Sequence, residues 1–172
     1  MSVYSIWLIP SEKSYAKLND EILELCRKYQ TPYFEPHVTL IDSLEGEEAD
    51  MIKKTSKLVG QMNSNFLRLT KLEHGETEHR CVFILAEIDE QLLNLHALAE
   101  KIFDKKEDVF IPHLSLLYGR FLSYTKDRII REIGKNYDQK VFFDKIILYD
   151  TTGKEESWHK VKEFKLSTLK NK

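Results

Sequence analysis

The sequence predicts an α+β fold with antiparallel or mixed sheets, contained in one domain that spans residues 1–172. Segments typical of β-strands alternate with segments whose apolar residues recur every three or four positions, as in amphipathic helices. Some strand segments follow one another with only a turn between them, which favours hairpins over a doubly wound parallel sheet. No linker rich in Pro, Gly or Ser divides the chain, whose length suits one domain.

The first half of the chain is predicted to form strand, helix, strand and helix. Residues 2–9 are rich in β-branched, aromatic and aliphatic side chains, as in a buried strand. Ser11 is a candidate N-cap for an amphipathic helix that ends before Pro32. A strand at 37–42 then leads into a helix near 47–63, whose first turn holds acidic residues that suit the helix dipole.

The second half is predicted to form a hairpin, a helix capped by Asp89, a strand, a further helix and two closing strands. These elements are expected at residues 66–73, 80–88, 90–104, 113–118, 125–137, 141–150 and 158–169. The resulting order is β-α-β-α-β-β-α-β-α-β-β.

Composition excludes several classes of protein. A net charge of −2 is unlike that of domains that coat nucleic acid, which carry a strong basic excess. The apolar N-terminal stretch is too short to cross a bilayer and has no basic flank, so we expect no membrane association. Cys26 and Cys81 lack metal-ligand or CxxC spacing, which favours buried free thiols in a reducing cytoplasm. A cytoplasmic monomer is the expectation.

An internal repeat is the most informative feature of the sequence. Residues 34–41 (FEPHVTLI) match residues 110–117 (FIPHLSLL) at seven of eight positions, counting identical and chemically equivalent residues. A proline precedes the histidine in both copies, where it can open a strand without loss of ladder hydrogen bonds. The repeat indicates a duplicated unit, with two copies packed about a pseudo-twofold axis on either side of a groove.

Strand geometry gives the repeat a chemical meaning. Side chains at i and i+2 share a face, so His37 points the same way as Thr39, and His113 the same way as Ser115. The apolar residues between them point to the opposite face, toward a core. Two imidazoles can act as a general acid/base pair near neutral pH, while two hydroxyls donate to phosphate oxygens. This arrangement suits an in-line displacement at phosphorus.

The sequence offers little sign of a metal site, because it has no His-x-His, HExxH or Asp-rich motif. The cluster at residues 73–79 (EHGETEH) reads better as a solvated hairpin turn than as a metal loop. Histidines alone can open a strained cyclic phosphodiester, whereas unstrained diesters usually call for metal ions. A metal-independent, cofactor-free reaction on a cyclic phosphate is therefore expected.

Residues 36–40 (PHVTL) and 112–119 (PHLSLLYG) resemble the two signatures of the 2H phosphoesterases. The opening residues 4–10 (YSIWLIP), and Trp158 ahead of two apolar strand residues, resemble the cyclic phosphodiesterase branch. The resemblance implies a bilobal fold with outer helices and a central, water-filled groove between two antiparallel sheets. It implies hydrolysis of ADP-ribose 1″,2″-cyclic phosphate to the 1″-phosphate, and of nucleoside 2′,3′-cyclic phosphates to 2′-phosphates.

Carried over to this chain, the resemblance implies a catalytic set and two substrate contacts. The catalytic residues would be His37, Thr39, His113 and Ser115, and the substrate contacts Tyr118 and Trp7. The partner would be a small cyclic-phosphate nucleotide.

Two other functions remain open at this point. One is a 2′,5′-phosphodiesterase or an RNA-end processing or ligase-like enzyme of the same superfamily, with RNA 3′ ends as partners. The other is a non-catalytic nucleotide-binding module. The assignment of general acid and general base to the two histidines also stays open.

Overall fold

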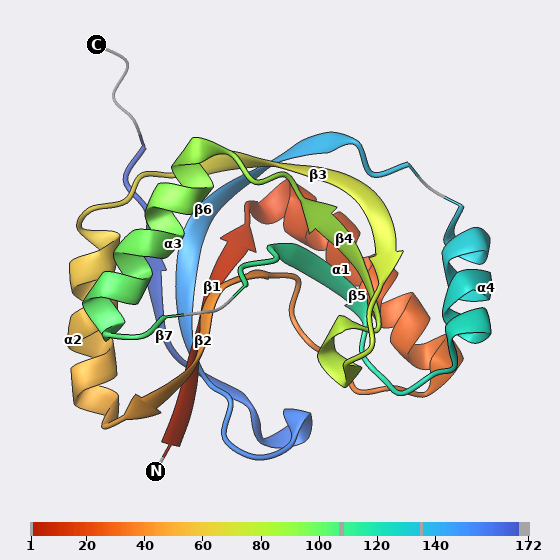
Figure 1. The fold of residues 1–172 in the computed structure, drawn as a ribbon, viewed down its shortest axis with the longest axis horizontal. Helices are drawn as coiled ribbons and strands as arrows, with labels where there is room; N and C mark the ends of the chain where they lie inside the picture. The colour runs from red at the N-terminus through yellow and green to blue at the C-terminus, as the bar shows by residue number, and fades with distance from the viewer. Residues whose placement is uncertain (1, 107–108, 135, 169–172) are drawn as a thin grey trace.

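The computed structural model describes residues 2–106, 109–134 and 136–168. Within these residues the elements follow the predicted order, with two 3-10 turns added (Figure 1). The strands are β1 (Ser2–Pro10), β2 (Val38–Gly46), β3 (Asn65–His74), β4 (Val82–Ala86), β5 (His113–Leu117), β6 (Gln139–Asp150) and β7 (His159–Lys165). The helices are α1 (Glu12–Tyr29), α2 (Glu48–Val59), α3 (Glu90–Phe103) and α4 (Ser123–Ile133), and the 3-10 turns are η1 (Glu78–Arg80) and η2 (Glu155–Ser157).

The ends of some elements differ from the prediction. Asp89 caps α3 as expected, its carboxylate accepting from the Leu92 amide at 2.7 Å. Ser11 occupies the N-cap position of α1, but its side chain makes no capping hydrogen bond. Helix α4 ends at Ile133 rather than at 137, because Gly134 adopts a left-handed conformation (φ 58°) that closes the helix.

The described strands form one hydrogen-bonded sheet in the order β1-β2-β5-β4-β3-β6-β7. The sequence predicted two sheets, and this part of the prediction is wrong. A single long strand explains the difference: β6 pairs with β3 through residues 139–143 and with β1 through residues 143–150. It therefore ties the strands of both halves together and closes the sheet on itself. All pairings between the named strands are antiparallel.

The narrowest join in this closed sheet lies between β2 and β5, which pair only through Val38 and Leu114. The two histidine motifs lie at this join, one on each strand. Adjacent strands that barely pair leave room for side chains and ligand between them. The site is therefore built where the two halves of the chain meet.

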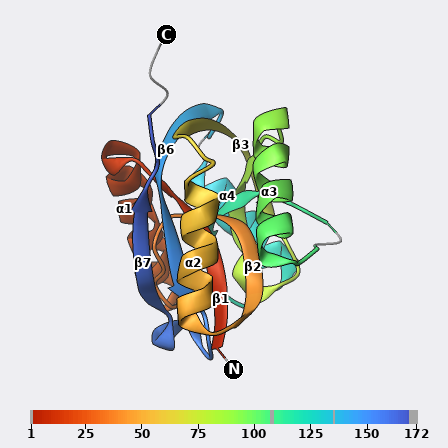
Figure 2. The ribbon, with the colours of Figure 1, turned by 90° about the vertical axis from the view of Figure 1, so that its left-hand side faces the viewer.

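The two halves repeat the same order of elements, β1-α1-β2-α2-β3 and β4-α3-β5-α4-β6. Their packing is also reciprocal, because α1 packs against β5 and α3 packs against β2. Helices α2 and α3 lie side by side on one flank of the sheet, and α4 lies on the other (Figures 1 and 2). At the level of topology, this correspondence parallels the repeat in the sequence.

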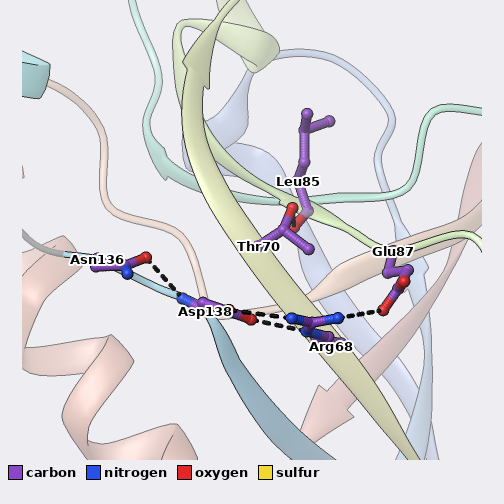
Figure 3. A network of polar contacts seen from close by, with 6 residues as sticks. All are labelled: Arg68, Thr70, Leu85, Glu87, Asn136 and Asp138. Carbon is purple, nitrogen blue, oxygen red and sulfur yellow. Dashed lines mark hydrogen bonds and ion pairs between the residues drawn. The ribbon is translucent and has the colours of Figure 1, made fainter.

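A polar network holds β3 against its neighbours (Figure 3). Arg68 donates from Nε and Nη2 to the two carboxylate oxygens of Asp138, at 2.7 and 3.0 Å, and also reaches Glu87. Thr70 donates to the Leu85 carbonyl at 3.1 Å. A bidentate arginine fixes geometry more strictly than a lysine would. The link fastens β3 to the segments beside β4 and β6.

The core contains the apolar residues that alternate with the motif side chains. Val38, Leu40, Leu114 and Leu116 are fully buried, as the strand alternation predicted. Cys26 and Cys81 are buried free thiols, which confirms that part of the prediction. Within the described residues, no helix combines the length and apolar character needed to cross a membrane.

Candidate active site

A cavity of about 570 Å³ opens where β2 and β5 diverge. It brings together the four predicted catalytic side chains and Tyr118, which lie far apart in the sequence. Its described lining residues are His37, Thr39, Asp42, Thr77, His79, Arg80, Lys105, Lys106, Val109, Phe110, Ile111, His113, Ser115 and Tyr118.

Both motif histidines are held by the same local contact. His37 Nδ1 lies 2.6 Å from the carbonyl oxygen of Glu35, and His113 Nδ1 lies 2.7 Å from that of Ile111. A carbonyl can only accept a hydrogen bond, so Nδ1 is assigned as the protonated nitrogen in each neutral ring. This tautomer leaves Nε2 with a lone pair. Each ring can then accept a proton through Nε2 without rearrangement.

A β-bulge follows each motif at the equivalent position. Trp7 pairs with Thr39 while Ile6 pairs with Ile41, so Leu40 is an extra residue in β2. Leu116 is the extra residue in β5 in the same way, because the partners of Phe83 and Val82 are Ser115 and Leu117. A bulge bends a strand and re-aims the side chains beyond it.

The bulges explain how two side chains of the wrong parity reach the cavity. Asp42 lies three residues after Thr39, and Tyr118 three residues after Ser115, yet all four line it. For Tyr118 the bend comes one residue after Ser115, at the bulge. Tyr118 is buried there and stacks on Phe34 at 3.6 Å, and burial raises the pKa of its phenol.

The two hydroxyls differ in their surroundings. Ser115 donates its hydroxyl proton to the backbone carbonyl of His79 at 2.9 Å. This bond attaches η1 to β5, and a second bond, from the Gly119 amide to the Glu78 carbonyl, reinforces it. Thr39 lines the cavity opposite, on β2. In the free protein, Ser115 therefore fixes a neighbouring turn.

His37 lies in a stack of three aromatic rings. Its imidazole is parallel to the indole of Trp7, with centroids 3.6 Å apart and planes 6° apart, and Tyr149 covers the other face of the indole at 3.9 Å. Trp7 is buried, and its Nε1 donates to Ser5 Oγ at 2.8 Å. Trp7 thus lies against the histidine and is not among the described residues that line the cavity.

Burial sets the protonation of both rings. It lowers the pKa of His37 to about 3; the nearby His113 also lowers it, and the Glu35 carbonyl opposes the shift. Burial is likewise the main cause that lowers the pKa of His113, and the Arg80 guanidinium adds to it. The Ile111 carbonyl and Asp42 act in the opposite direction on His113. Both imidazoles are neutral in the free protein at neutral pH.

The structure adds residues that sequence reasoning did not select. Residues 73–79 were predicted to be a solvated turn, yet Thr77, His79 and the adjacent Arg80 line the cavity. The position of this turn in the sequence was a partial indication, because a turn that joins two strands beside a motif strand can fold over the site. Lys105 and Lys106 come from the segment after α3, which carried no motif.

Two histidines outside the motifs have other surroundings. His96 is buried, its Nδ1 contacts the Leu40 carbonyl at 2.9 Å, and its ring stacks on Phe110. His79 contacts the Glu155 carboxylate through Nε2 at 2.7 Å. In the part of the chain that the structure describes, no group of three or more His, Cys, Asp or Glu could hold a metal ion.

Comparison with known proteins decides the family. A family model described as cyclic phosphodiesterase-like protein matches residues 1–170. The chain belongs to this family. A cyclic phosphodiesterase of Arabidopsis thaliana is 26% identical over 143 residues, which cover 81% of this chain and 74% of the relative. A phosphoesterase-type protein of Bacillus licheniformis is 28% identical over 123 residues, which cover 66% and 69%. The chain is accordingly a phosphoric diester hydrolase of the 2H type.

Solved structures share the fold of this family member. A protein of Thermus thermophilus matches with a TM-score of 0.66 at 16% identity, covering 97% of this chain and 99% of its own. Escherichia coli LigT in complex with 3′-AMP matches with a TM-score of 0.62 at 15% identity, covering 97% and 99%. These likenesses establish the α+β architecture.

Proposed function

We propose that this chain hydrolyses small cyclic phosphodiesters without a metal ion, using His37 and His113 as an acid/base pair. The substrates are ADP-ribose 1″,2″-cyclic phosphate and nucleoside 2′,3′-cyclic phosphates, and the products are the 1″- and 2′-phosphates. One observation carries the proposal: two imidazoles, held in the same tautomer by the same backbone contact, share one cavity.

The reaction needs one proton acceptor and one proton donor. Nε2 of one neutral histidine takes a proton from water as the water oxygen forms a new bond to phosphorus. The bond from phosphorus to one ring oxygen breaks, and the second histidine, protonated, gives that oxygen its proton. The product holds a phosphomonoester and a new hydroxyl, and the two histidines exchange their protonation states through solvent.

The surroundings favour His37 as the base and His113 as the acid. The nearly complete burial of His37 lowers its pKa to about 3, so the ring is neutral near pH 7. His113 is more exposed, and the Ile111 carbonyl and Asp42 favour its protonated form against the opposing charge of Arg80. A bound phosphate anion also favours the protonated ring. His113 is therefore the easier of the two to protonate when substrate is present.

The remaining polar side chains hold the phosphate. Thr39 donates its hydroxyl proton to a non-bridging oxygen, and Ser115 does the same after releasing the His79 carbonyl. Tyr118 lines the same cavity and contacts the substrate. Trp7 was a candidate contact in the sequence, but its position behind His37 favours support of the imidazole.

A panel of cyclic phosphates, assayed in excess chelator with products identified by phosphorus NMR, tests the proposal. Turnover of ADP-ribose 1″,2″-cyclic phosphate or of a nucleoside 2′,3′-cyclic phosphate, with regiospecific monoester products, is expected. A strict requirement for a divalent ion, or inertness toward every cyclic phosphate, would refute it.

The other functions considered from the sequence have their own discriminating assays. A rate on 2′,5′-linked oligoadenylate that exceeds the rate on cyclic mononucleotides would favour the 2′,5′-phosphodiesterase or RNA-end enzyme. The E. coli LigT structures with 3′-AMP and with ATP are consistent with small nucleotides as ligands of this fold. A non-catalytic binding module has no need for both histidines and both hydroxyls in one cavity.

A further inference from the structure

The turn η1 contributes to the wall of the cavity, although it belongs to neither histidine motif. His79 and Arg80, both in this turn, are among the lining residues. A single 3-10 turn of three residues has little stability of its own, so contacts with other segments must fix it. The side chains of η1 can contact a substrate only while these contacts hold.

Two segments that are distant in the sequence hold His79. Its backbone carbonyl accepts the hydroxyl proton of Ser115 at 2.9 Å, which attaches the turn to β5. Its imidazole Nε2 lies 2.7 Å from a carboxylate oxygen of Glu155, which belongs to η2 between β6 and β7. The yellow-green η1 and the blue η2 lie near each other in Figure 1.

The Glu155 carboxylate is a charged acceptor with little exposure to water. Its side chain is 15% exposed, against 50% for that of His79. Burial raises the pKa of the Glu155 carboxyl, but its own backbone amide and the His79 ring outweigh burial, so the net shift is downward. An ionised carboxylate can only accept, so Nε2 of His79 is assigned as the donor. The contact is therefore a charge-assisted hydrogen bond.

The hairpin that carries Glu155 is fixed independently of η1. The Thr152 hydroxyl accepts from the Val3 amide at 2.9 Å, which ties the hairpin to β1. Trp158, the residue after η2, packs against the His79 ring with centroids 5.2 Å apart. The hairpin thus gives η1 a support that belongs to the sheet.

Substrate binding changes one of the two contacts of His79. In the proposed reaction, Ser115 turns its single hydroxyl proton from the His79 carbonyl to the phosphate. The turn then loses its bond to Ser115 when its own side chains lie beside the ligand.

The other contacts of η1 with the segment after β5 are made by Glu78. The Gly119 amide donates to its carbonyl at 3.0 Å, and Arg120 pairs with its carboxylate. The Arg120 side chain is almost fully exposed, and exposed ion pairs contribute little. After Ser115 has turned away, the bond from Glu155 still holds His79 in place.

From these contacts we propose that Glu155 is a positioning residue, which keeps His79 and Arg80 at the cavity when Ser115 transfers its hydrogen bond to the phosphate. The inference rests on the proposed function and adds a residue from outside both motifs. The cavity lining, as far as the structure describes it, does not include Glu155, so this residue acts through η1. Its loss should cost more in the bound protein than in the free protein, which retains the bond from Ser115.

The experiment measures how variants at position 155 bind and turn over adenosine 2′,3′-cyclic phosphate. Glu155→Ala should raise KM by about tenfold, the effect of losing one charge-assisted hydrogen bond. The value of kcat should change less, because η1 contacts the substrate and the transition state alike. The dissociation constant of adenosine 2′-phosphate, measured by isothermal titration calorimetry, should rise by a similar factor. Glu155→Gln keeps an acceptor oxygen for Nε2 and should restore most of the affinity.

Glu156→Ala is the matched control. Glu156 is the next residue of η2 and is exposed, so its loss removes the same charge from the same turn and should leave KM unchanged. Circular dichroism melts of both variants check that they fold.

The Ser115→Ala background tests the coupling between the two contacts. There the free and the bound protein both lack the bond from Ser115, so adding Glu155→Ala should raise KM by less than about twofold. A merely structural role of Glu155 would lower the free energy of unfolding without this dependence on Ser115.

Two outcomes would overturn the inference alone. One is an active wild type in which Glu155→Ala has the same KM as Glu156→Ala. The other is an equal rise of KM on loss of Glu155 with and without Ser115. A wild type that neither turns over cyclic phosphates nor binds adenosine 2′-phosphate would instead refute the proposed function, and this inference with it.

Discussion

The two histidine motifs have nearly the same backbone and different surroundings. Each histidine follows a proline, contacts the carbonyl two residues before it and is followed by a bulge. The neighbouring ring differs: the Trp7 indole lies flat on His37, while Phe83 meets His113 at 5.0 Å with planes tilted by 58°. The sequence repeat therefore sets the geometry of the imidazoles, and the residues around each copy set its protonation.

The largest expected effect follows from removing either imidazole. His37→Ala and His113→Ala should each lower kcat by about 10²- to 10⁴-fold, the usual contribution of a general acid or base. The double variant should lose much less than the product of the two effects, since the histidines act on one proton-transfer sequence. Steady-state kinetics on a cyclic phosphate measures this, with circular dichroism melts as the check on folding. Wild-type turnover in either single variant would contradict the mechanism.

The difference in burial should appear in the pH dependence of stability. The pKa of His37 is about 3 in the folded state against 6.5 for an exposed histidine, so the unfolded chain binds more protons between these values. Stability contributed by this group is present above pH 6.5 and is lost as pH falls toward 3. At pH 5 the loss is about 2 kcal/mol relative to pH 8.

Urea unfolding at pH 8 and pH 5 measures that loss. His37→Gln, which has no titrating ring, should show a smaller difference between the two pH values than the wild type does. His113→Gln is the matched comparison, and it should retain most of the wild-type difference because His37 is still present. An unchanged difference in His37→Gln would show that other groups cause the acid sensitivity.

The two hydroxyls provide a finer comparison. Thr39→Val should lower kcat by about tenfold through loss of one donor to the phosphate. Ser115→Ala should have a similar kinetic effect and should also lower the free energy of unfolding by about 1 kcal/mol, because it removes the bond that fastens η1. Kinetics and urea unfolding together separate the two roles.

The repeat itself supplies the control for these hydroxyl variants. Each motif copy carries the hydroxyl residue that the other lacks, so Thr39→Ser and Ser115→Thr should retain most of the activity. A stability loss in Thr39→Val equal to that in Ser115→Ala would remove the distinction between a hydroxyl that faces only the ligand and one that also holds a turn.

The sequence predicted the parts of this molecule that local rules control. Strand alternation assigned His37 and Thr39 to one face and Leu40 to the other, and the element order followed from periodicity and turns. The single closed sheet was not predictable, because it depends on which partners β6 selects along its length. The bulges were not predictable from the sequence either. Two consecutive buried apolar residues such as Leu40 and Ile41 also occur in regular strands.

The cationic lining was missed for a related reason. Arg80 and Lys106 lie outside any motif, in connecting segments that only the tertiary fold places at the cavity. Lysines and arginines in such segments have the composition of ordinary solvated surface. Only the tertiary arrangement distinguishes them from other surface residues.

The smallest expected effect concerns the indole that distinguishes the two motifs. Trp7→Phe should change kcat at neutral pH by less than about threefold, because a smaller ring covers the imidazole less completely and raises the pKa of His37 toward 6.5, at which the ring is still mostly neutral near pH 7. If His37 is the base, the acid limb of the pH–rate profile should move upward in this variant. Trp158→Phe is the matched control, since Trp158 meets Trp7 edge-on at 6.2 Å and is not stacked on His37. A change in KM that depends on the nucleobase, with no movement of the acid limb, would instead make Trp7 a substrate contact, as the resemblance first implied.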